Sequence, residues 1–402
     1  MSVIVQSEEL ISRSKWRGVG TGVVLAALLG MLAGCSMFES EDDEEVEPAK
    51  LVEFEATQDF DKIWSDSVGD GQGDLFYRLR PAVVGDRIFV AGYDGEIEAF
   101  NRLDGDSLWD ADIDANITAG VGAGGGLVAV GTQDGLVLAL NAESGEVLWK
   151  TAVNSEVLAA PQTDGRIVAV VTIDGHLKGL DGKTGAETWS YAVTAPALIL
   201  RASAAPIIVG DMVIAGFANG RVIAVNLADG KPLWEVRAGI PKGSSEIERL
   251  IDIASDPIVS DGNLFVVSYQ GMLSAVDVQS GRKLWEREAS SYAGIGDSYS
   301  SVYVVDPKGT VTAFAKNNQG VRWEQTALAR RQLSGATAWL DYVVVGDIEG
   351  YVHVMAQNDG RFVAREKVDG DGVRVQPIAV DDMLYVFGNS GKIAAYKLEA
   401  ED

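Results

Sequence analysis

The sequence predicts an all-β fold, an eight-bladed β-propeller of four-stranded antiparallel blades, and a spaced repeat is the main evidence. A turn, a short apolar strand, a second turn and a tryptophan recur along the chain, as from Asp134-Gly135 to Trp149. The first turn of the eight units contains Gly95, Gly135, Gly175, Gly220, Gly271, Gly309, Gly350 and Gly391. The intervals between them are 40, 40, 45, 51, 38, 41 and 41 residues. A period near 40 with several strands per unit is typical of propeller blades.

The fourth unit shows most clearly the four strands expected in each blade. Turns separate four stretches of strand-forming residues, at 205–209, 212–216, 221–225 and 232–236. The first three stretches are mainly apolar or small, which indicates strands covered on both faces by neighbouring sheets. The fourth alternates between apolar and polar residues, which is typical of an outer strand half exposed to water.

Tryptophans keep the same register in most units. Each follows the glycine of the second turn by three or four residues, at Trp109, Trp149, Trp189, Trp234, Trp285 and Trp323. We expect each indole to pack on the next blade and to donate its N–H to the backbone; stacking on a cofactor is the alternative. The seventh unit has Ala364 instead. Small residues mark third strands, where we expect adjacent sheets to approach closely, at Ala99, Ala139, Ala224, Ala275, Ala313 and Ala395.

The eighth unit contains only three of its four strands, and the other end of the chain supplies a candidate for the fourth. This unit ends soon after Tyr396, whereas residues 61–68, which include Trp64, resemble a fourth strand. We therefore expect the N-terminal strand to complete the last blade, because this closure removes two exposed sheet edges. The predicted propeller spans residues 56–402.

The N-terminal region predicts a lipoprotein signal. Basic residues within 13–17 precede an apolar stretch at 18–31, and Leu32-Ala33-Gly34 then leads into Cys35, the single cysteine. The apolar stretch is short for a membrane span, so residues 1–34 are predicted to be a signal peptide. An uncleaved membrane anchor is the alternative. Residues 32–35 resemble a bacterial lipobox, which implies a lipid on Cys35.

Residues 35–55 are predicted to form a lipidated, acidic and flexible tether. Acidic residues crowd the window 39–47, and such runs repel one another and extend; a binding role for the run is the alternative. In the lipoproteins that this segment resembles, an aspartate after the cysteine retains the protein in the inner membrane. Ser36 occupies that position, which implies a lipid anchor at the periplasmic face of the outer membrane.

The charge of the chain excludes several kinds of partner. The formal net charge is −26, which argues against binding nucleic acid and against adsorption of the folded surface to anionic lipid. A basic partner is favoured instead. The single cysteine excludes an intramolecular disulfide.

Two long intervals between repeats mark the predicted binding surface. They contain residues 194–201 and 241–252, each between the fourth strand of one unit and the first strand of the next. Such connections emerge on one face of a propeller, so we expect one patch; loops that pack only on each other are the alternative. Apolar and charged residues mix there as they do in protein interfaces. The predicted partner-binding residues are Leu198, Leu200, Arg201, Glu246, Glu248, Arg249 and Asp252.

The second insertion also carries a helix-start pattern. Ser245 is predicted to cap a short helix that begins at Glu246, and Glu248 stands in the capping-box position.

The sequence contains no recognisable pattern for catalysis or metal binding. His176 and His353, the two histidines, have no second histidine, cysteine or spaced carboxylate that would indicate zinc. No nucleophile-elbow motif occurs, and the acidic turn residues are explained more simply as hairpin formers than as calcium ligands. The sequence therefore predicts no catalytic residue, no metal and no cofactor.

The repeat resembles a known family. The pattern Ala-x-Asp/Asn-x-x-Ser/Thr/Asp-Gly-x-x-x-Trp is similar to that of pyrroloquinoline-quinone-type propellers. Eight repeats behind a lipobox, with Ser245-Glu-Ile-Glu-Arg-Leu250 in the long insertion, resemble the propeller lipoproteins of the outer-membrane β-barrel assembly (BAM) complex. The resemblance covers the whole chain after Cys35.

The resemblance implies a non-enzymatic scaffold that docks on the periplasmic POTRA domains of BamA. The implied contacts are Leu198, Leu200 and Arg201 from the first insertion and Asp252 from the second, whereas Ala254 replaces a further acidic family position. Nascent outer-membrane barrel precursors are a second implied partner, which could add strands to outer blade edges. A quinoprotein dehydrogenase that uses pyrroloquinoline quinone is the alternative that the repeat alone implies.

Overall fold

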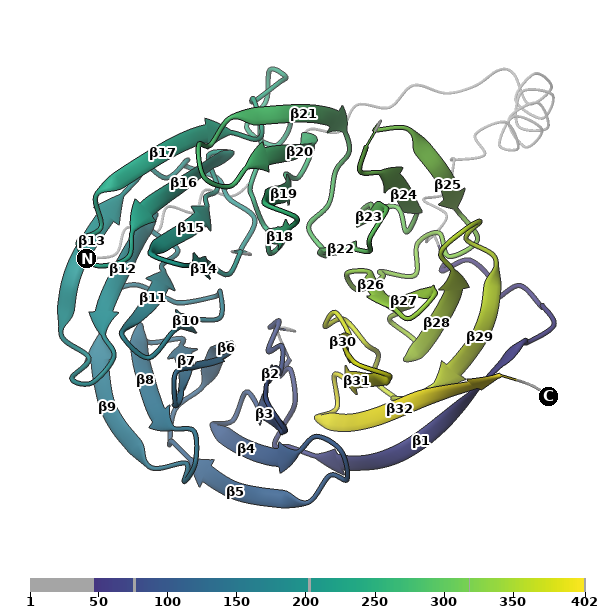
Figure 1. Cartoon of the computed structure of the whole chain (residues 1–402), viewed down its shortest axis with the longest axis horizontal. Coiled ribbons are helices and arrows are strands. Elements are labelled where there is room, and N and C mark those ends of the chain that lie inside the picture. The colour runs from purple at the N-terminus through teal and green to yellow at the C-terminus, as the bar shows by residue number, and fades with distance from the viewer. Residues whose placement is uncertain (1–46, 75–76, 202–203, 318, 401–402) are drawn as a thin grey trace, which may run out of the picture. The chain divides into compact units, whose positions relative to one another are not determined.

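Eight four-stranded antiparallel sheets follow one another around a ring in the unit Pro48–Asp402 (Figure 1). The computed structural model describes residues 47–74, 77–201, 204–317 and 319–400. The predicted signal peptide, the lipidation site Cys35 and Ser36 lie outside these residues. The described residues contain strands, turns and loops but no helix, which confirms the prediction of an all-β, eight-bladed propeller.

The first four blades each use four consecutive strands. The first blade comprises β2 (Ala82–Val84), β3 (Arg87–Ala91), β4 (Glu96–Asn101) and β5 (Ser107–Asp112). The second comprises β6 (Ile117–Gly124), β7 (Leu127–Thr132), β8 (Leu136–Asn141) and β9 (Val147–Ala152). The third comprises β10 (Gln162–Thr163), β11 (Ile167–Val171), β12 (His176–Asp181) and β13 (Glu187–Ala192). The fourth comprises β14 (Ile207–Val209), β15 (Met212–Gly216), β16 (Arg221–Asn226) and β17 (Pro232–Arg237).

The next three blades repeat this plan. The fifth blade comprises β18 (Ile258–Ser260), β19 (Asn263–Val267), β20 (Met272–Asp277) and β21 (Lys283–Glu288). The sixth comprises β22 (Ile295–Asp297), β23 (Ser301–Val305), β24 (Val311–Ala315) and β25 (Val321–Gln325). The seventh comprises β26 (Thr337–Trp339), β27 (Tyr342–Gly346), β28 (Tyr351–Ala356) and β29 (Phe362–Lys367). Figure 1 shows the first strand of each blade nearest the centre and the fourth strand outermost.

The eighth blade joins the two ends of the propeller. It comprises β30 (Ile378–Val380), β31 (Met383–Phe387), β32 (Lys392–Ala400) and β1 (Gln58–Ser67). The strand β1 runs antiparallel to β32 and occupies the outer position, so the predicted closure by the N-terminal strand is confirmed. In both directions around the ring, each blade then has a neighbour that covers its faces.

Tryptophans connect each of six blades to the next one. Each of these indoles donates its Nε1–H to a backbone carbonyl of the following blade at 2.8–3.1 Å. This confirms the prediction for five of the six tryptophans that the sequence singled out and adds Trp64; the sixth, Trp285, packs on Phe265. The pairs are Trp64–Arg102, Trp109–Ala142, Trp149–Gly182, Trp189–Leu227, Trp234–Val278 and Trp323–Gln357. The second-turn glycine lies against the same ring: a Cβ on Gly105 would lie 2.7 Å from the Trp64 indole. Gly105 also has a positive φ of 80°, so glycine is needed there twice over.

The small residues of the third strands make room for these tryptophans. Ala99 lies directly opposite Trp109 across β4 and β5, and the same pairing recurs in other blades. The small residues therefore have a role within one blade, in addition to the one expected from close approach between adjacent sheets. In the seventh blade the small residue is on the fourth strand instead: Ala364 stands there, opposite Val354 of the third strand. Phe60, Trp339 and Tyr396 pack into the core between the seventh and eighth blades.

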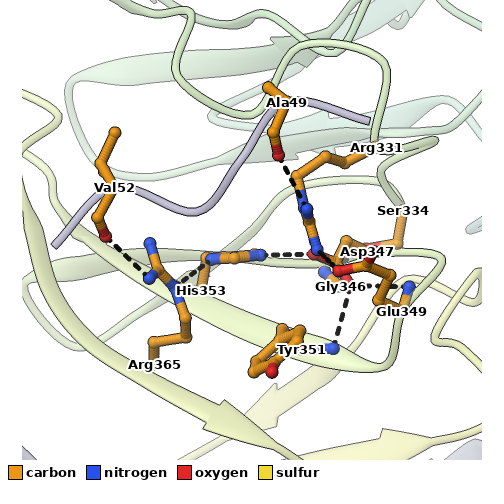
Figure 2. A network of polar contacts seen from close by, with 10 residues as sticks. All are labelled: Ala49, Val52, Arg331, Ser334, Gly346, Asp347, Glu349, Tyr351, His353 and Arg365. Atoms are coloured by element: carbon orange, nitrogen blue, oxygen red, sulfur yellow. Dashed lines mark hydrogen bonds and ion pairs between the residues drawn. The ribbon is translucent and has the colours of Figure 1, made fainter. Parts of the chain in front are cut away.

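The end of the predicted tether packs on the propeller. The sequence predicted residues 35–55 to be flexible, but residues 48–57 lie against the seventh blade and the loop that precedes it (Figure 2). Ala49 N–H donates to the Ala329 carbonyl at 3.0 Å. Phe54 packs on Phe362, with 5.6 Å between ring centroids. These contacts correct the prediction for the last part of the tether.

Two arginines bind the backbone of this segment. Arg331 donates to the Ala49 carbonyl and Arg365 to the Val52 carbonyl, both at 2.9 Å. Figure 2 shows how Asp347 and His353 connect the two arginines. Because Arg365 Nε donates to His353 Nδ1 at 3.0 Å, the ring proton lies on Nε2, which donates to Asp347 at 2.8 Å. Both histidine nitrogens are therefore used structurally.

Candidate docking surface

The two insertions lie side by side and are joined by hydrogen bonds. The first connects β13 to β14, and the second connects β17 to β18. Leu200 N–H in the first insertion donates to Asp252 Oδ2 in the second at 2.5 Å. Ala205 N–H donates to Asp256 Oδ1 at 2.7 Å. Carboxylates of the second insertion thus hold the backbone of the first, and hydrogen bonds to ionised acceptors are among the stronger ones.

A groove of about 640 Å³ runs between the two insertions. Leu198, Glu246 and Arg249, three of the predicted residues, line it together. Leu198 is 40% exposed. An exposed apolar side chain beside a carboxylate and a guanidinium is the composition that protein interfaces favour.

Arg201 leaves the groove and pairs with a different loop. Its guanidinium donates to Glu156 Oε1 at 2.7 Å, and Glu156 lies between β9 and β10. The side chain of Arg201 remains 58% exposed. The guanidinium is therefore held in place by one carboxylate while donors stay available to an acidic group of a partner.

Glu248 has a structural role that the sequence only partly predicted. The expected helix does not form: residues 246–249 make a single turn, with Arg249 N–H donating to the Ser245 carbonyl. The capping box itself is present, because Glu248 N–H donates to Ser245 Oγ and Ser245 N–H donates to Glu248 Oε2. Backbone donors from Ser245 and Ser244 hold the pKa of Glu248 below its usual range. Its carboxylate is thus directed into its own loop.

Asp252 is buried, so it cannot meet a partner directly in this conformation. Its exposed fraction is 0%, and its carboxylate contacts the first insertion at Leu200. Any effect of Asp252 on a partner therefore passes through the position of Leu200. Ala254 is also buried, and its carbonyl accepts a hydrogen bond from Arg78.

Asp252 is expected to make the protein less stable as pH rises through about 6. Burial raises the pKa of Asp252 to about 6, partly offset by the Leu200 N–H, whereas an unfolded aspartate titrates near about 3.9. Between these values the folded state binds more protons, so the free energy of unfolding falls as pH rises. Asp252→Asn keeps an acceptor for Leu200 and should remove this part of the pH dependence. Urea denaturation across this range tests it, with exposed Asp359→Asn as the control; identical pH profiles for wild type and Asp252→Asn would contradict it.

Several groove residues were missed by the sequence analysis. Tyr191, Asn219, Arg221 and Arg237 line the groove from the blades themselves. Arg221 directly follows the hairpin turn Asn219-Gly220, a position that the repeat places at the edge next to the insertions. The position of Arg221 within the repeat could therefore have indicated from the sequence that it lies next to the insertions. Glu156 carried no signal, because its pairing with Arg201 crosses 45 residues.

The described part of the chain was also compared with the requirements of a membrane span and of a metal site, and it meets neither. No helix within it is long and apolar enough to cross a membrane. Within the same residues, no three histidine, cysteine, aspartate or glutamate side chains gather closely enough to hold a metal ion.

The fold and the joined insertions define the class, an eight-bladed propeller protein with a loop-built groove at one edge. A family model described as "Outer membrane protein assembly factor BamB" matches residues 93–325. The chain belongs to this BamB family.

Curated relatives support this membership along nearly the full length. The outer membrane protein assembly factor BamB of Pseudomonas aeruginosa is 54% identical over 374 residues, which cover 93% of this chain and 98% of the relative. The BamB of Xanthomonas campestris is 38% identical over 395 residues, covering 94% and 97%.

Solved structures agree with the fold. The crystal structure of BamB from Moraxella catarrhalis has a TM-score of 0.77 at 28% identity, covering 84% of this chain and 99% of that one. The quinohemoprotein alcohol dehydrogenase of Comamonas testosteroni has a TM-score of 0.66 at 13% identity, covering 84% and 76%. The likeness to the dehydrogenase concerns the fold alone.

Proposed function

We propose that the chain is a non-enzymatic accessory subunit of outer membrane protein assembly, within the BAM complex, and docks on the periplasmic POTRA domains of BamA. The observation that carries the proposal is the hydrogen bond between Leu200 and Asp252, which joins two separate insertions into one surface. The BamB relatives, whose printed names describe outer membrane protein assembly factors, supply the context.

The surface offers a plausible chemistry for a protein partner. Leu198 in the groove and the half-buried Leu200 beside it supply apolar contact, and Arg201 supplies a guanidinium that is already oriented by Glu156. A side chain that is already ordered in the free protein loses less conformational entropy on binding. A lipid on Cys35 would keep the propeller at the periplasmic face of the outer membrane, where POTRA domains lie.

Leu200→Asp and Arg201→Glu are each expected to weaken binding to purified POTRA domains at least about tenfold, which is typical of interface hot spots. Leu200→Asp places a charge in the apolar part of the surface, and Arg201→Glu opposes the existing Glu156 carboxylate. Biolayer interferometry with the full-length chain in detergent measures the effect.

The matched controls are Leu148→Asp and Arg361→Glu, exposed residues of the second and seventh blades. They should bind POTRA domains as the wild type does. A wild type that does not bind would end the proposal, as would insertion variants that bind unchanged while thermal melts show all proteins folded.

The absence of enzymatic activity is part of the proposal and has a simple test. The likeness to quinohemoprotein dehydrogenases is a likeness of fold. Protein incubated with pyrroloquinoline quinone and Ca²⁺ and then passed through gel filtration is expected to show no alcohol-dependent dye reduction. Dye reduction by the loaded protein would favour the dehydrogenase instead.

A further inference from the structure

The centre of the ring holds a cavity of about 320 Å³ that the docking surface does not use. Residues near the first strands of most blades form its wall, including apolar side chains such as Val83, Leu158 and Ile378. The charged residues in the wall are Arg78, Arg80, Arg374 and Asp256. Three cations and one anion thus meet there, in a protein whose net charge is −26.

Two of these guanidiniums lack an ionic partner. Among the described residues, no carboxylate oxygen lies within 4.0 Å of a side-chain nitrogen of Arg78 or Arg80. Arg78 donates to the Ala254 carbonyl at 3.1 Å, whereas Arg80 Nε is buried and has no hydrogen-bond partner. Asp256 is already engaged by the Ala205 N–H.

A second kind of donor in the wall is also unsatisfied. The Ser255 hydroxyl is buried, with the residue 2% exposed, and has no hydrogen-bond partner. Burial lowers the pKa of both Arg78 and Arg80, and the charge of Asp256 only partly offsets it. Arginine nevertheless stays protonated in proteins, so the half-buried Arg78 and Arg80 keep positive charge in the cavity wall, and removing such charge from water is costly without a counterion.

We propose that the central cavity binds a small organic anion that carries carboxylate groups. The planar guanidinium presents paired N–H donors that match the two oxygens of a carboxylate. The apolar wall would contact the carbon skeleton of the anion. A volume of about 320 Å³ lies at the small end of ligand pockets, which favours a small molecule over a segment of a partner protein.

Citrate, a small tricarboxylate, is the probe. Isothermal titration of the full-length chain in detergent, at constant ionic strength set with NaCl, should show saturable binding of one citrate per chain. Arg80→Gln should weaken citrate binding at least tenfold. Arg80→Lys keeps the charge but loses the paired N–H donors, so its citrate affinity should lie between those of the wild type and Arg80→Gln. Exposed Arg282→Gln in the fifth blade is the matched control and should bind as the wild type does.

Thermal melts make the result independent of a folding defect. Without citrate, Arg80→Gln should melt at or above the wild-type temperature, because it removes an uncompensated charge. Citrate should then raise the melting temperature of the wild type more than that of the variant. Unsaturable heats for the wild type, or equal citrate affinity in wild type and Arg80→Gln, would overturn the proposal. The test needs no partner protein, so its failure would leave the docking function untouched.

Discussion

Replacing Asp347 by alanine is expected to lower the free energy of unfolding by about 3–5 kcal/mol, as when one partner of a buried ion pair is removed. The carboxylate is 0% exposed and accepts from Arg331 Nε at 2.6 Å and from His353 Nε2 at 2.8 Å. Its other oxygen accepts the Glu349 and Tyr351 N–H groups at 3.0 Å. Without it, one guanidinium, one imidazole and two amides lose a buried partner.

Urea denaturation of Asp347→Ala and of the wild type measures this loss. Asp359→Ala is the control, because its carboxylate forms an exposed pair with Arg361 at 3.5 Å, and such pairs contribute about 0–1 kcal/mol. A loss for Asp347→Ala as small as the control's would show that the network does not stabilise the fold.

The same carboxylate predicts a pH effect of definite sign. Burial favours the protonated acid, but His353 and Arg331 outweigh it and hold the pKa of Asp347 below its usual range. The stabilisation is therefore present at neutral pH and is lost as pH falls below about 4, where an unfolded aspartate takes up its proton. Asp347→Ala should consequently flatten the acid limb of the stability profile.

Removing β1 is expected to prevent cooperative folding altogether. A chain that begins at Gly69 lacks the outer strand of the eighth blade and leaves the edge of β32 unpaired, which favours aggregation. It also lacks Trp64, which is 8% exposed, donates to the Arg102 carbonyl and packs on Phe100 and Tyr385. Loss of the indole alone, in Trp64→Ala, should cost about 3–5 kcal/mol.

A chain that begins at Pro48 is the matched control, because it keeps both β1 and the segment before it. Gel filtration and thermal melts should show a monomer with one sharp transition for this control, and aggregated protein without a transition for the shorter chain. A shorter chain that stays monomeric and melts cooperatively would mean that seven complete blades and an open eighth suffice.

The repeat made most of the fold predictable. Each blade repeats the same local sequence pattern. Where one unit lacks the glycine turn or the tryptophan, the pattern in the other units still predicts its strands. The place of Trp64 followed from the likeness of residues 61–68 to the fourth strands of the other units. The packing between the seventh and eighth blades, where Ala364 replaces the tryptophan, could not be predicted. Its aromatic residues Phe60, Trp339 and Tyr396 come from three separate segments and follow no repeat.

The candidate site was predictable only in its location. The insertions stand out as departures from the repeat, but the direction of a loop side chain depends on contacts that no period encodes. Glu248 is directed into its own loop and Asp252 is buried, although both have the composition of surface residues. The segment before β1 was misassigned for a related reason, since its few apolar residues, Leu51, Val52 and Phe54, follow a strongly acidic run.

The packing of residues 48–57 sets a limit on reach. With a lipid on Cys35 as proposed, 13 residues lead from the anchor to Pro48, and a fully extended chain of that length spans at most about 45 Å. A tether free as far as residue 55 would allow about 70 Å by the same measure. The arginines that bind the Ala49 and Val52 carbonyls therefore shorten the maximum length of the tether by about a third. They also fix the point on the propeller at which the tether begins. The distance from the bilayer at which the propeller can bind a partner is restricted in consequence.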